Sequence, residues 1–404
     1  MIYKDDDFDI LVIRDYYPSY QNPTNSTWVF QQVKYLQKSG YHPLVISPTP
    51  IIPFRRYLSL PSTYEKPNTN IDYYENTAVI RPPYIKIPDN KAPAFTLKNL
   101  SKVICKYGNS KSIRLVHSHF GQNGIAAVKL KKNLNVPLIT SFYGYDSGRL
   151  GKHFLPYYNN LKNNGDLFLV LSEDMKKDLI NLGFPKEKIL IHHLGIDINE
   201  FNINNKHKND NLFNLLTIAR FDEGKGIHIV LDAINLLFKL NPSMKDVIKY
   251  HIVGGGKYEE ILKNIINKYD LSNNVEIIHN LGVKNGREIV KNELSKADVF
   301  ILCSYTTKNG TKEGTPVVLM EAQACGLPCI ATKHAGIPEI IINGETGILI
   351  NENNSEEIYN AILTLYNNNE LLHNMGEKGR ENIINNFNYK KQMNKLDIIY
   401  RQLI

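Results

Sequence analysis

The chain has 404 residues, of which 42% are apolar and 22% charged, and its formal net charge is +8. This composition excludes the disordered class, and no run approaches the roughly 18 consecutive apolar residues of a membrane span. A single core rarely serves a chain of this length, so we expect two domains of roughly 200 residues each. The acidic opening MIYKDDDFDI differs from the basic and then apolar start of a signal peptide, and we expect a cytoplasmic protein.

The positive charge admits nucleic acid, anionic lipid or phosphorylated small molecules as partners. Basic residues concentrate in 98-KNLSKVICKYGNSKSIR-114 and 129-KLKK-132, and both segments have amphipathic spacing. No zinc knuckle, RNP-type aromatic motif or arginine-rich arm accompanies them, so nucleic acid is not an expected partner. A solvated basic face is the commoner explanation of such segments, and contact with an anionic membrane surface is the functional alternative.

Strands alternate with helices along almost the whole chain. In the first half, we predict helices at 28–40 and 172–183 and strands at 8–13, 43–47, 113–118, 137–142, 167–172 and 188–193. A second series of strands is predicted at 213–220, 249–255, 275–281, 298–304, 328–332 and 347–350. The pattern is typical of the α/β class and predicts two doubly wound parallel-sheet domains.

The domain boundary is expected in the polar segment around 195–211. This gives an N-terminal domain of residues 1–200 and a C-terminal domain of residues 201–384. The last segment, 385–404, contains an amphipathic helix that we expect to pack back on the N-terminal domain. Ligands of doubly wound sheets bind outside the carboxyl ends of the strands, so two such domains predict an interdomain cleft.

A basic pair follows the first strand of the second half. Arg220 ends that strand, and Lys225 lies between Gly224 and Gly226 just before a predicted helix. Guanidinium, ammonium and the free backbone N–H groups of a helix start all attract phosphate oxygens, so this arrangement suits a diphosphate.

The next strand ends in glycines, Gly254 and Gly255 among them. Their lack of a side chain permits the backbone to approach a nucleotide closely. Glu259 stands where a dinucleotide-binding fingerprint has its third glycine, so we do not expect NAD or FAD.

Two glutamates lie eight positions apart in the segment KEGTPVVLMEAQACGLP, which otherwise has the pattern of a buried helix. Thr315 and Pro316 are the predicted N-cap and first helical residue, and Gly326 is the predicted stop. Glu313 therefore precedes the helix, whereas Glu321 lies within it. The structural explanation, without a function, is that one glutamate forms a salt bridge and the other is a surface carboxylate.

The functional explanation assigns both carboxylates to hydroxyl groups. The helix start at Gly314, Thr315 and Pro316 offers a positive dipole end for phosphate, which a carboxylate beside it would repel. Glu313 makes sense there if it binds a sugar hydroxyl, and Glu321 makes sense if it binds a ribose diol. With the basic pair, the two glutamates predict a nucleotide-sugar pocket.

The same stretch resembles a known family. EGTPVVLMEA is similar to the E-x7-E motif of glycosyltransferase family 4, the retaining enzymes of GT-B fold. Arg220 and Lys225 fit the family's Arg…Lys-Gly element, and 194-LGIDINEF-201 and 335-AGIPEIIINGETGILI-350 resemble its linker and closing signatures. The matches cover nearly all of 190–350 in the family's order, and the first half resembles the family more loosely.

The resemblance implies two Rossmann-like domains that face each other across a cleft, with the acceptor on the N-terminal and the nucleotide-sugar donor on the C-terminal domain. It implies that Glu313 is catalytic and orients the donor sugar. The other donor-site residues that it implies are Arg220, Lys225, Gly314, Thr315 and Pro316 at the diphosphate, Glu321 at the ribose, and Gly254 and Gly255 at the nucleotide.

In the first half, VHSHFGQNG places His119 at a strand end, where the family has a histidine near the donor sugar. The resemblance implies that His119 is the second catalytic residue. TSFYGYD resembles the family's T-x-F-H-G-x-D segment, with Tyr143 in place of the histidine. This departure removes an acid or base and leaves a hydroxyl that can hydrogen-bond an acceptor. The acceptor side then comprises Tyr143, Asp146 and, where many relatives carry paired glycines, Ser26 and Thr27.

The implied reaction is transfer of a hexose from a nucleoside diphosphate sugar, with a UDP-sugar favoured, and with retention at the anomeric carbon. Positive groups would stabilise the leaving diphosphate, so neither a metal nor another cofactor is expected. The family builds cell-surface polysaccharides, lipopolysaccharide and glycolipids. This implies a glycan acceptor, lipid-linked in the favoured case, and a peripheral position on the inner face of the plasma membrane.

Two other functions are alternatives at this stage. A GT-B-like nucleotide-sugar 2-epimerase would share the diphosphate site but would need no acceptor cleft. A non-catalytic sugar or nucleic-acid binding protein would bind without turnover, and binding to polynucleotide would be sensitive to salt.

Overall fold

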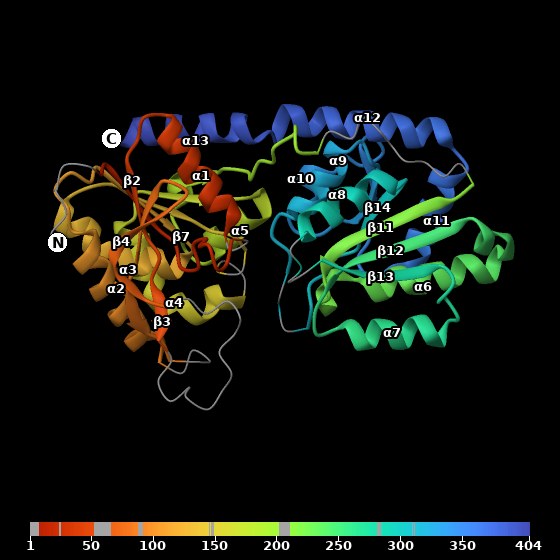
Figure 1. Cartoon of the computed structure of the whole chain (residues 1–404), viewed down its shortest axis with the longest axis horizontal. Coiled ribbons are helices and arrows are strands. Elements are labelled where there is room, and N and C mark those ends of the chain that lie inside the picture. Colours follow the sequence, from red (N-terminus) through yellow and green to blue (C-terminus); the bar gives the residue numbers. More distant parts are fainter. Residues whose placement is uncertain are drawn as a thin grey trace. The chain divides into compact units, whose positions relative to one another are not determined.

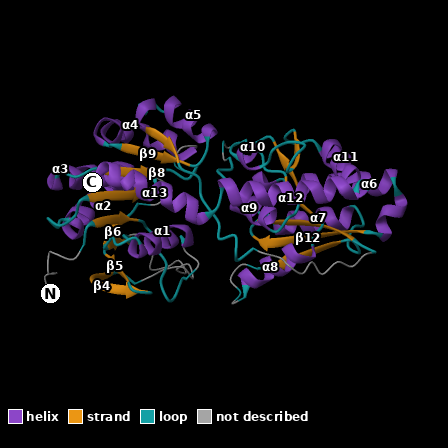
Figure 2. Ribbon diagram, turned by 90° about the horizontal axis from the view of Figure 1, so that it is seen from above, coloured by secondary structure: helices purple, strands orange, loops and turns teal. Residues whose placement is uncertain are grey.

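The computed structural model describes residues 8–404 except 24–25, 52–65, 88–91, 145, 147–148, 202–210, 281–282, 284, 309 and 311, and residues 149–154 by their backbone alone. The chain forms two compact units, one of residues 1–193 with 393–404 and one of residues 194–392 (Figure 1). Helices lie on both sides of the strands in each unit (Figure 2). The two parallel-sheet units confirm the predicted α/β class.

The first unit is built on a sheet with the strand order β10-β9-β8-β7-β1-β2-β5-β4. The strands are β1 (Ile10–Ile13), β2 (Pro43–Ile46), β4 (Asn68–Tyr74), β5 (Thr77–Arg81), β7 (Leu115–His119), β8 (Leu138–Ser141), β9 (Leu167–Val170) and β10 (Ile189–Ile191). Neighbouring strands pair in parallel except β4 with β5. The strand order reverses at β1, so the connections that follow β1 and β7 diverge, and a ligand site is expected at the carboxyl ends of these strands.

The helices of the first unit are α1 (Thr27–Lys38), α2 (Pro93–Gly108), α3 (Gly121–Leu134), α4 (Arg149–Asn164) and α5 (Glu173–Asn181). The predicted serine cap of α5 is confirmed, because the Ser172 side chain accepts a hydrogen bond from the backbone N–H of Met175 at 3.2 Å. A two-stranded sheet of β3 (Thr49–Ile51) and β6 (Pro83–Ile85) completes the unit.

The second unit is built on a fully parallel sheet with the order β13-β12-β11-β14-β15-β16. The strands are β11 (Phe213–Arg220), β12 (Ile248–Gly255), β13 (Val275–His279), β14 (Val299–Leu302), β15 (Cys329–Thr332) and β16 (Gly347–Ile350). Successive connections run outward from β11 on one side and from β14 on the other. The switch point therefore lies between β11 and β14, where a ligand site is expected at the carboxyl ends.

Two apolar clusters cover the two faces of this second sheet. One packs strand residues such as Leu215 and Ile301 against α6 (Ile227–Leu240), α7 (Glu259–Lys268) and α11 (Ser355–Tyr366). The other packs strand residues such as Leu216 and Phe300 against α8 (Gly286–Lys296), α9 (Val317–Ala324), α10 (Ile337–Ile340) and α12 (Asn369–Asn386). Consecutive strand residues thus point to opposite faces, and both faces are buried, which explains the nearly continuous apolar runs in the sequence.

The helix that carries Glu321 begins one residue later than predicted. Its N-cap is Pro316, and Thr315 precedes the cap, so the predicted threonine cap is wrong. The predicted stop is confirmed. Gly326 has φ +69°, its N–H bonds to the carbonyl of Gln323 at 2.9 Å, and the N–H of Leu327 bonds to the carbonyl of Ala322 at 3.1 Å. This pair of bonds is the Schellman motif, which favours glycine at that position.

The last helix, α13 (Tyr389–Leu403), runs from the second unit into the first, which takes residues 393–404. Within the first unit, Asp397 accepts a hydrogen bond from the Tyr41 hydroxyl at 2.9 Å, and the Tyr400 hydroxyl lies 2.5 Å from Nδ1 of His117. The end of α13 thereby packs beside β7, next to His117.

Candidate active site

At the switch point of the second sheet, a lysine and a glutamate meet. Lys225 follows β11 in a short 3-10 turn, and its ammonium group forms an ion pair with the carboxylate of Glu313, in the loop after β14. Gly226, with φ +67°, lets this turn approach β14, because a Cβ atom there would lie 2.0 Å from the carbonyl oxygen of Cys303. The lysine and glutamate side chains keep 21% and 15% of their exposure, so the pair is partly open to solvent.

Glu313 is ionised at neutral pH. Burial opposes its charge, but the Lys225 ammonium group and hydrogen bonds from the Gly314 N–H and the Ser304 hydroxyl outweigh burial and hold the pKa below its ordinary value. The two hydrogen bonds are both 3.3 Å long. The carboxylate is therefore a negative charge held beside a positive one. The pair lies at the carboxyl ends of the strands, where doubly wound sheets bind their ligands.

His334 holds the backbone of the loop that carries Glu313, called the glutamate loop below. The sequence analysis did not predict this residue. Its Nε2 accepts a hydrogen bond from the N–H of Glu313 at 3.1 Å, so its Nδ1 is the protonated nitrogen, which donates to Glu352 at 2.7 Å. His334 is only 3% exposed and follows β15, the neighbour of β14. A histidine just past a parallel strand, one strand away from the glutamate loop, is the signal that could have identified it.

Glu321 lies apart from the lysine pair and binds an arginine instead. Nη1 of Arg287 donates to Glu321 at 2.7 Å, and the same guanidinium group contacts Glu200 at 2.9 Å and 3.2 Å. The guanidinium carbon also lies 4.6 Å from the ring centroid of Phe201, a favourable cation–π position. Both residue 200 and residue 201 belong to the linker signature, so this signature is tied to the helix of Glu321.

Burial dominates the electrostatics of Glu321. Because the residue is only 7% exposed, burial raises its pKa, and the Arg287 charge opposes this rise without cancelling it. Burial also disfavours the charge of Arg287, but Glu200 and Glu321 outweigh that effect and raise the pKa of the guanidinium group. Arg287 was missed by the sequence analysis because it lies 34 positions before its partner and in no motif.

Three other predicted donor residues lie at the carboxyl ends of β11 and β12. Arg220 is largely exposed and pairs with Asp222 at 2.7 Å. A Cβ atom on Gly254 would lie 1.9 Å from the carbonyl oxygen of Ala219, and the Gly255 carbonyl accepts from the N–H of Phe221 at 2.9 Å. Gly254 therefore allows β11 and β12 to stay close at their carboxyl ends, and the role of both glycines toward a nucleotide stays a prediction.

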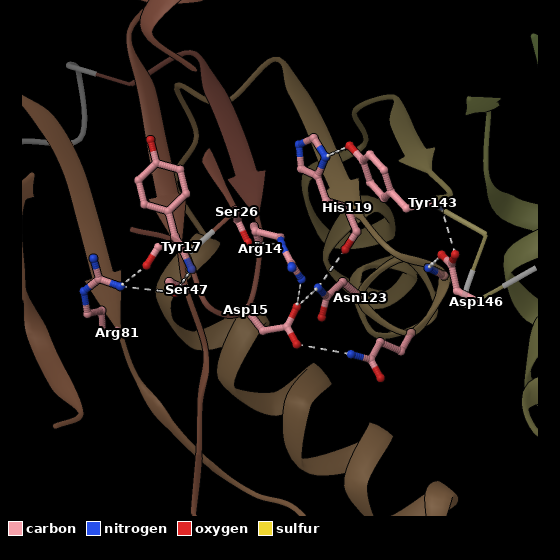
Figure 3. A network of polar contacts seen from close by, with 12 residues as sticks. Arg14, Asp15, Tyr17, Ser26, Ser47, Arg81, His119, Asn123, Tyr143 and Asp146 are labelled. Carbon is pink, nitrogen blue, oxygen red and sulfur yellow. Dashed lines mark hydrogen bonds and ion pairs between the residues drawn. The ribbon is translucent and has the colours of Figure 1, made fainter. Parts of the chain in front are cut away.

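In the first unit, a buried polar network lies beyond the carboxyl end of β1 (Figure 3). Arg14 follows β1, and its Nε donates to the hydroxyl of Ser26 at 2.9 Å, while its Nη1 pairs with Asp15 at 2.5 Å. Asn123, at the start of α3, donates to Asp15 at 3.1 Å and to the carbonyl oxygen of His119 at 2.8 Å. Ser26 is thus connected to β7, the strand of His119, through Arg14, Asp15 and Asn123, which the sequence analysis did not predict. Thr27 is exposed.

His119, Tyr143 and Asp146 meet at the ends of β7 and β8. Nδ1 of His119 lies 2.6 Å from the Tyr143 hydroxyl. Asp146 is buried, and its carboxylate accepts from the N–H groups of Tyr143 at 2.9 Å and of Gly121 at 2.7 Å. Asp146 thereby ties the tyrosine loop to the start of α3, and its contact with an acceptor stays a prediction.

Burial determines the protonation of the two histidines here. It lowers the pKa of His119 well below the ordinary value, and the charges of His117 and Arg14 lower it further. Burial also lowers the pKa of His117 to about 3. Both imidazoles are therefore neutral at physiological pH.

Within the described residues, neither a metal site nor a membrane span is found. No group of three or more His, Cys, Asp or Glu side chains is arranged to hold a metal ion. No described helix combines the length and the apolar character needed to cross a bilayer.

Comparison with known families matches the chain in two consecutive parts. The family model "Glycosyltransferase Family 4" matches residues 26–200, and the model "Glycosyl transferases group 1" matches residues 198–382. The chain belongs to glycosyltransferase family 4. The resemblance predicted from the glutamate motif is thereby confirmed, and the models meet at the linker signature.

Two curated relatives of this family 4 chain are named for the synthesis of bacterial polysaccharides. It is 33% identical over 276 residues to the putative colanic acid biosynthesis glycosyltransferase WcaL of Salmonella typhimurium, a match covering 67% of this chain and 66% of that protein. It is 34% identical over 253 residues to the amylovoran biosynthesis glycosyltransferase AmsK of Erwinia amylovora, covering 61% and 60%. The matches thus span just under two thirds of these relatives.

Solved structures show the fold of this family 4 member. Sucrose-phosphate synthase from Thermosynechococcus elongatus superposes with a TM-score of 0.75 at 20% identity, covering 98% of this chain and 99% of that one. Anabaena HepE, in complex with UDP and glucose, superposes with a TM-score of 0.71 at 15% identity, covering 98% and 100%. The predicted GT-B fold of two Rossmann-like domains is confirmed.

Proposed function

We propose that this protein transfers a hexose from a UDP-sugar to a glycan acceptor during the synthesis of a cell-envelope polysaccharide, with retention at the anomeric carbon. The observation that carries the proposal is the Lys225–Glu313 ion pair at the switch point of the second sheet. A cation and an ionised carboxylate fixed side by side at a ligand edge suit a substrate that joins a phosphate to a hydroxyl-rich group. A nucleoside diphosphate sugar has that composition.

The charged residues predicted at the donor site each have a role in this reaction. Lys225 and Arg220 bind the diphosphate, with the backbone of Gly314 to Pro316 before α9, and they stabilise the negative charge that develops as it leaves. Glu313 accepts hydrogen bonds from the sugar hydroxyls and orients the anomeric carbon. Positive side chains supply the electrostatic stabilisation, so the proposed reaction requires no enzyme-bound metal.

Glu321 binds the ribose hydroxyls in this proposal, and Arg287 positions it. Arg287 contacts one carboxylate oxygen of Glu321, Oε1. A carboxylate offers about four acceptor positions, so further ones stay available for a diol. The pair also limits the cost of a buried charge when no nucleotide is bound.

We propose front-face attack for the chemical step. The acceptor hydroxyl approaches the anomeric carbon from the side of the leaving diphosphate, and a phosphate oxygen takes its proton as the glycosidic bond forms. The bond to the diphosphate breaks in the same step, and the nucleoside diphosphate leaves with that proton. His119, a neutral imidazole of the first unit, takes no proton in this scheme.

The relatives support the choice of donor and acceptor. The HepE structures contain UDP, UDP with glucose, or UDP-glucose. A 153-residue stretch is 29% identical to an Escherichia coli enzyme named UDP-Gal:alpha-D-GlcNAc-diphosphoundecaprenol alpha-1,3-galactosyltransferase, a match covering 38% of this chain and 36% of that one. UDP as the nucleotide and a lipid-linked acceptor follow from these names as the favoured choices. None of the relatives named here is an epimerase or a non-catalytic binding protein.

A basic surface on the first unit fits a lipid-linked acceptor. Lys98, Lys102 and Lys106 recur every four positions along α2 and are exposed. Lys129 and Lys132 are exposed on α3, which packs against α2. We propose that this surface contacts the anionic inner face of the plasma membrane, since each basic residue near such a surface contributes about 1 kcal/mol of attraction.

A transfer assay tests the proposal. The purified protein is incubated with radiolabelled UDP-glucose or UDP-galactose and a lipid extract from an envelope-polysaccharide producer, in the presence of EDTA. We expect label in the lipid fraction and, by NMR of the product, the anomeric configuration of the donor. An inverted product would overturn retention, and absence of transfer from every UDP-, GDP- and ADP-hexose would overturn the function.

A further inference from the structure

The geometry of the first unit points to a task for Tyr143. We propose that the Tyr143 hydroxyl donates a hydrogen bond to Nδ1 of His119 and so holds His119 in the tautomer that carries its proton on Nε2. Tyr143 is then a positioning residue, which acts on the reaction through His119. The catalytic meaning of this inference rests on the proposed function, whereas the tautomer is a property of the chain alone.

The Tyr143 oxygen and Nδ1 of His119 are 2.6 Å apart, within hydrogen-bond distance. A phenol carries an O–H that donates, and a neutral imidazole has one nitrogen that accepts and does not donate. We therefore assign the phenol as the donor and the imidazole nitrogen as the acceptor.

The protonation states of both side chains fit this direction. Desolvation raises the pKa of Tyr143, so the phenol keeps its proton across the physiological range. Burial lowers the pKa of His119, so one ring nitrogen lacks a proton and can accept. With both partners neutral and the phenol donating to Nδ1, the single proton of the imidazole sits on Nε2.

Both rings are held from several sides, so the contact is rigid. The backbone N–H of Tyr143 donates to Asp146 at 2.9 Å, and the tyrosine ring packs against Trp28 and Phe120 with centroids 5.8 Å and 4.9 Å away. His119 stacks on His117 with centroids 4.3 Å apart.

His117 is fixed in turn. Its Nδ1 lies 2.5 Å from the Tyr400 hydroxyl, and its Nε2 lies 2.8 Å from the Ser141 hydroxyl. The stacking partner of His119 therefore cannot rotate without losing two hydrogen bonds. Fixing both partners lowers the entropic cost of keeping a single tautomer.

The tautomer determines what His119 can do. With its proton on Nε2, the imidazole presents an N–H donor, which suits the oxygen of a sugar hydroxyl. It cannot take a proton through that nitrogen, so deprotonation of the acceptor falls to another group, as the front-face scheme requires. Tyr143, which stands where the family has a histidine, thus makes His119 a hydrogen-bond donor toward the sugar.

NMR of the full-length protein with 15N-labelled histidine tests the tautomer directly. Long-range correlations distinguish a protonated ring nitrogen from an unprotonated one, and the signals of His119 are assigned by their loss in His119→Gln. In the unmodified protein we expect a protonated Nε2 and an unprotonated Nδ1. A protonated Nδ1 would overturn the proposal, and this measurement requires no variant to fold beyond the one used for assignment.

Tyr143→Phe removes the hydroxyl and keeps the ring. The His119 signals are expected to shift toward a mixture of the two tautomers, and kcat is expected to fall about tenfold with donor KM within about threefold. Tyr250→Phe is the control, because it also removes a tyrosine hydroxyl that makes a side-chain hydrogen bond, here to Thr217 at 2.8 Å in the other unit. The control should leave both the His119 signals and kcat unchanged.

Two further outcomes separate this inference from the proposed function. An unchanged single tautomer in Tyr143→Phe, with the fold intact, would overturn the positioning role. If the unmodified protein transfers no sugar from any donor, the proposed function fails, and the NMR measurement still decides the tautomer.

Discussion

The two units hold their polar site residues in place in different ways, one with ion pairs and the other with hydrogen bonds between neutral groups. In the second unit, the site residues are charged and paired, lysine with Glu313 and arginine with Glu321. In the first unit, the predicted catalytic group is a neutral imidazole, held by a hydroxyl and by a second neutral imidazole. The difference follows the proposed division of work, because a departing diphosphate needs fixed charge, whereas a sugar hydroxyl needs a donor in a fixed direction.

Removing the charge of Glu313 should have the most severe consequence for transfer. In Glu313→Gln we expect kcat to fall by about 10²- to 10³-fold with a modest loss of donor binding, because the sugar loses a charged acceptor in the transition state. Steady-state kinetics with the UDP-sugar measure this. The exposed Glu377→Gln on α12 is the control and should leave kcat unchanged. Unchanged turnover in Glu313→Gln would refute its role.

Removing Glu321 should act on nucleotide affinity rather than on turnover. In Glu321→Ala we expect UDP to bind roughly 10- to 100-fold more weakly, because hydrogen bonds to a charged group contribute about 1.5–3 kcal/mol. Calorimetric titration with UDP measures the change. Arg287→Lys keeps the positive charge but loses the planar contact with two carboxylates, and we expect it to weaken UDP by a smaller factor. A folded Glu321→Ala variant with unchanged affinity would contradict the ribose assignment.

His334→Ala should move the glutamate loop without changing its charge. The N–H of Glu313 would lose its acceptor, and we expect kcat to fall about tenfold. His373→Ala, an exposed histidine on α12, serves as the control for removal of an imidazole. If His334→Ala matches the control in both kcat and thermal stability, the loop is held by its other contacts.

The pH dependence of stability should reveal the charged pair of the second unit. The pKa of Glu313 is depressed in the folded chain, so its ionised form stabilises the fold above the unfolded value and this stabilisation is lost as the pH falls through the folded value. We expect the unmodified protein to exceed Glu313→Gln in stability at pH 7 and the difference to shrink below about pH 4.5. Thermal unfolding of both proteins from pH 7 to pH 3 measures it. A difference that stays the same from pH 7 to pH 3 would show that charge is not its cause.

The sequence predicted most strands that form local apolar runs, although it missed the buried β5, TAVIR. Strands such as β11 and β14 are buried on both faces, so their runs of Val, Ile, Leu and Phe are unambiguous. β4, in contrast, reads NTNIDYY, lies largely exposed at the sheet edge and was not predicted. A polar edge strand owes its conformation to pairing with its neighbour, which no local pattern records.

The candidate site was predictable where a motif carried it. Glu313, Glu321 and Lys225 lie within motifs, and the strand-end rule places the lysine and the first glutamate together, as the structure does. Arg287 and Asn123 act through partners far along the chain, and only the folded chain brings them into contact. The roles of all these residues toward substrates stay predictions.

Nucleotide binding is the most direct test of the central claim that the second unit holds a metal-free site for a UDP-sugar. Thermal unfolding of the purified protein is measured with UDP, GDP and ADP in the presence of EDTA, and again with magnesium. We predict that UDP alone stabilises the protein, equally with and without magnesium, and that Glu321→Ala loses most of this shift. Stabilisation by no nucleotide, or only in the presence of magnesium, would contradict the claim.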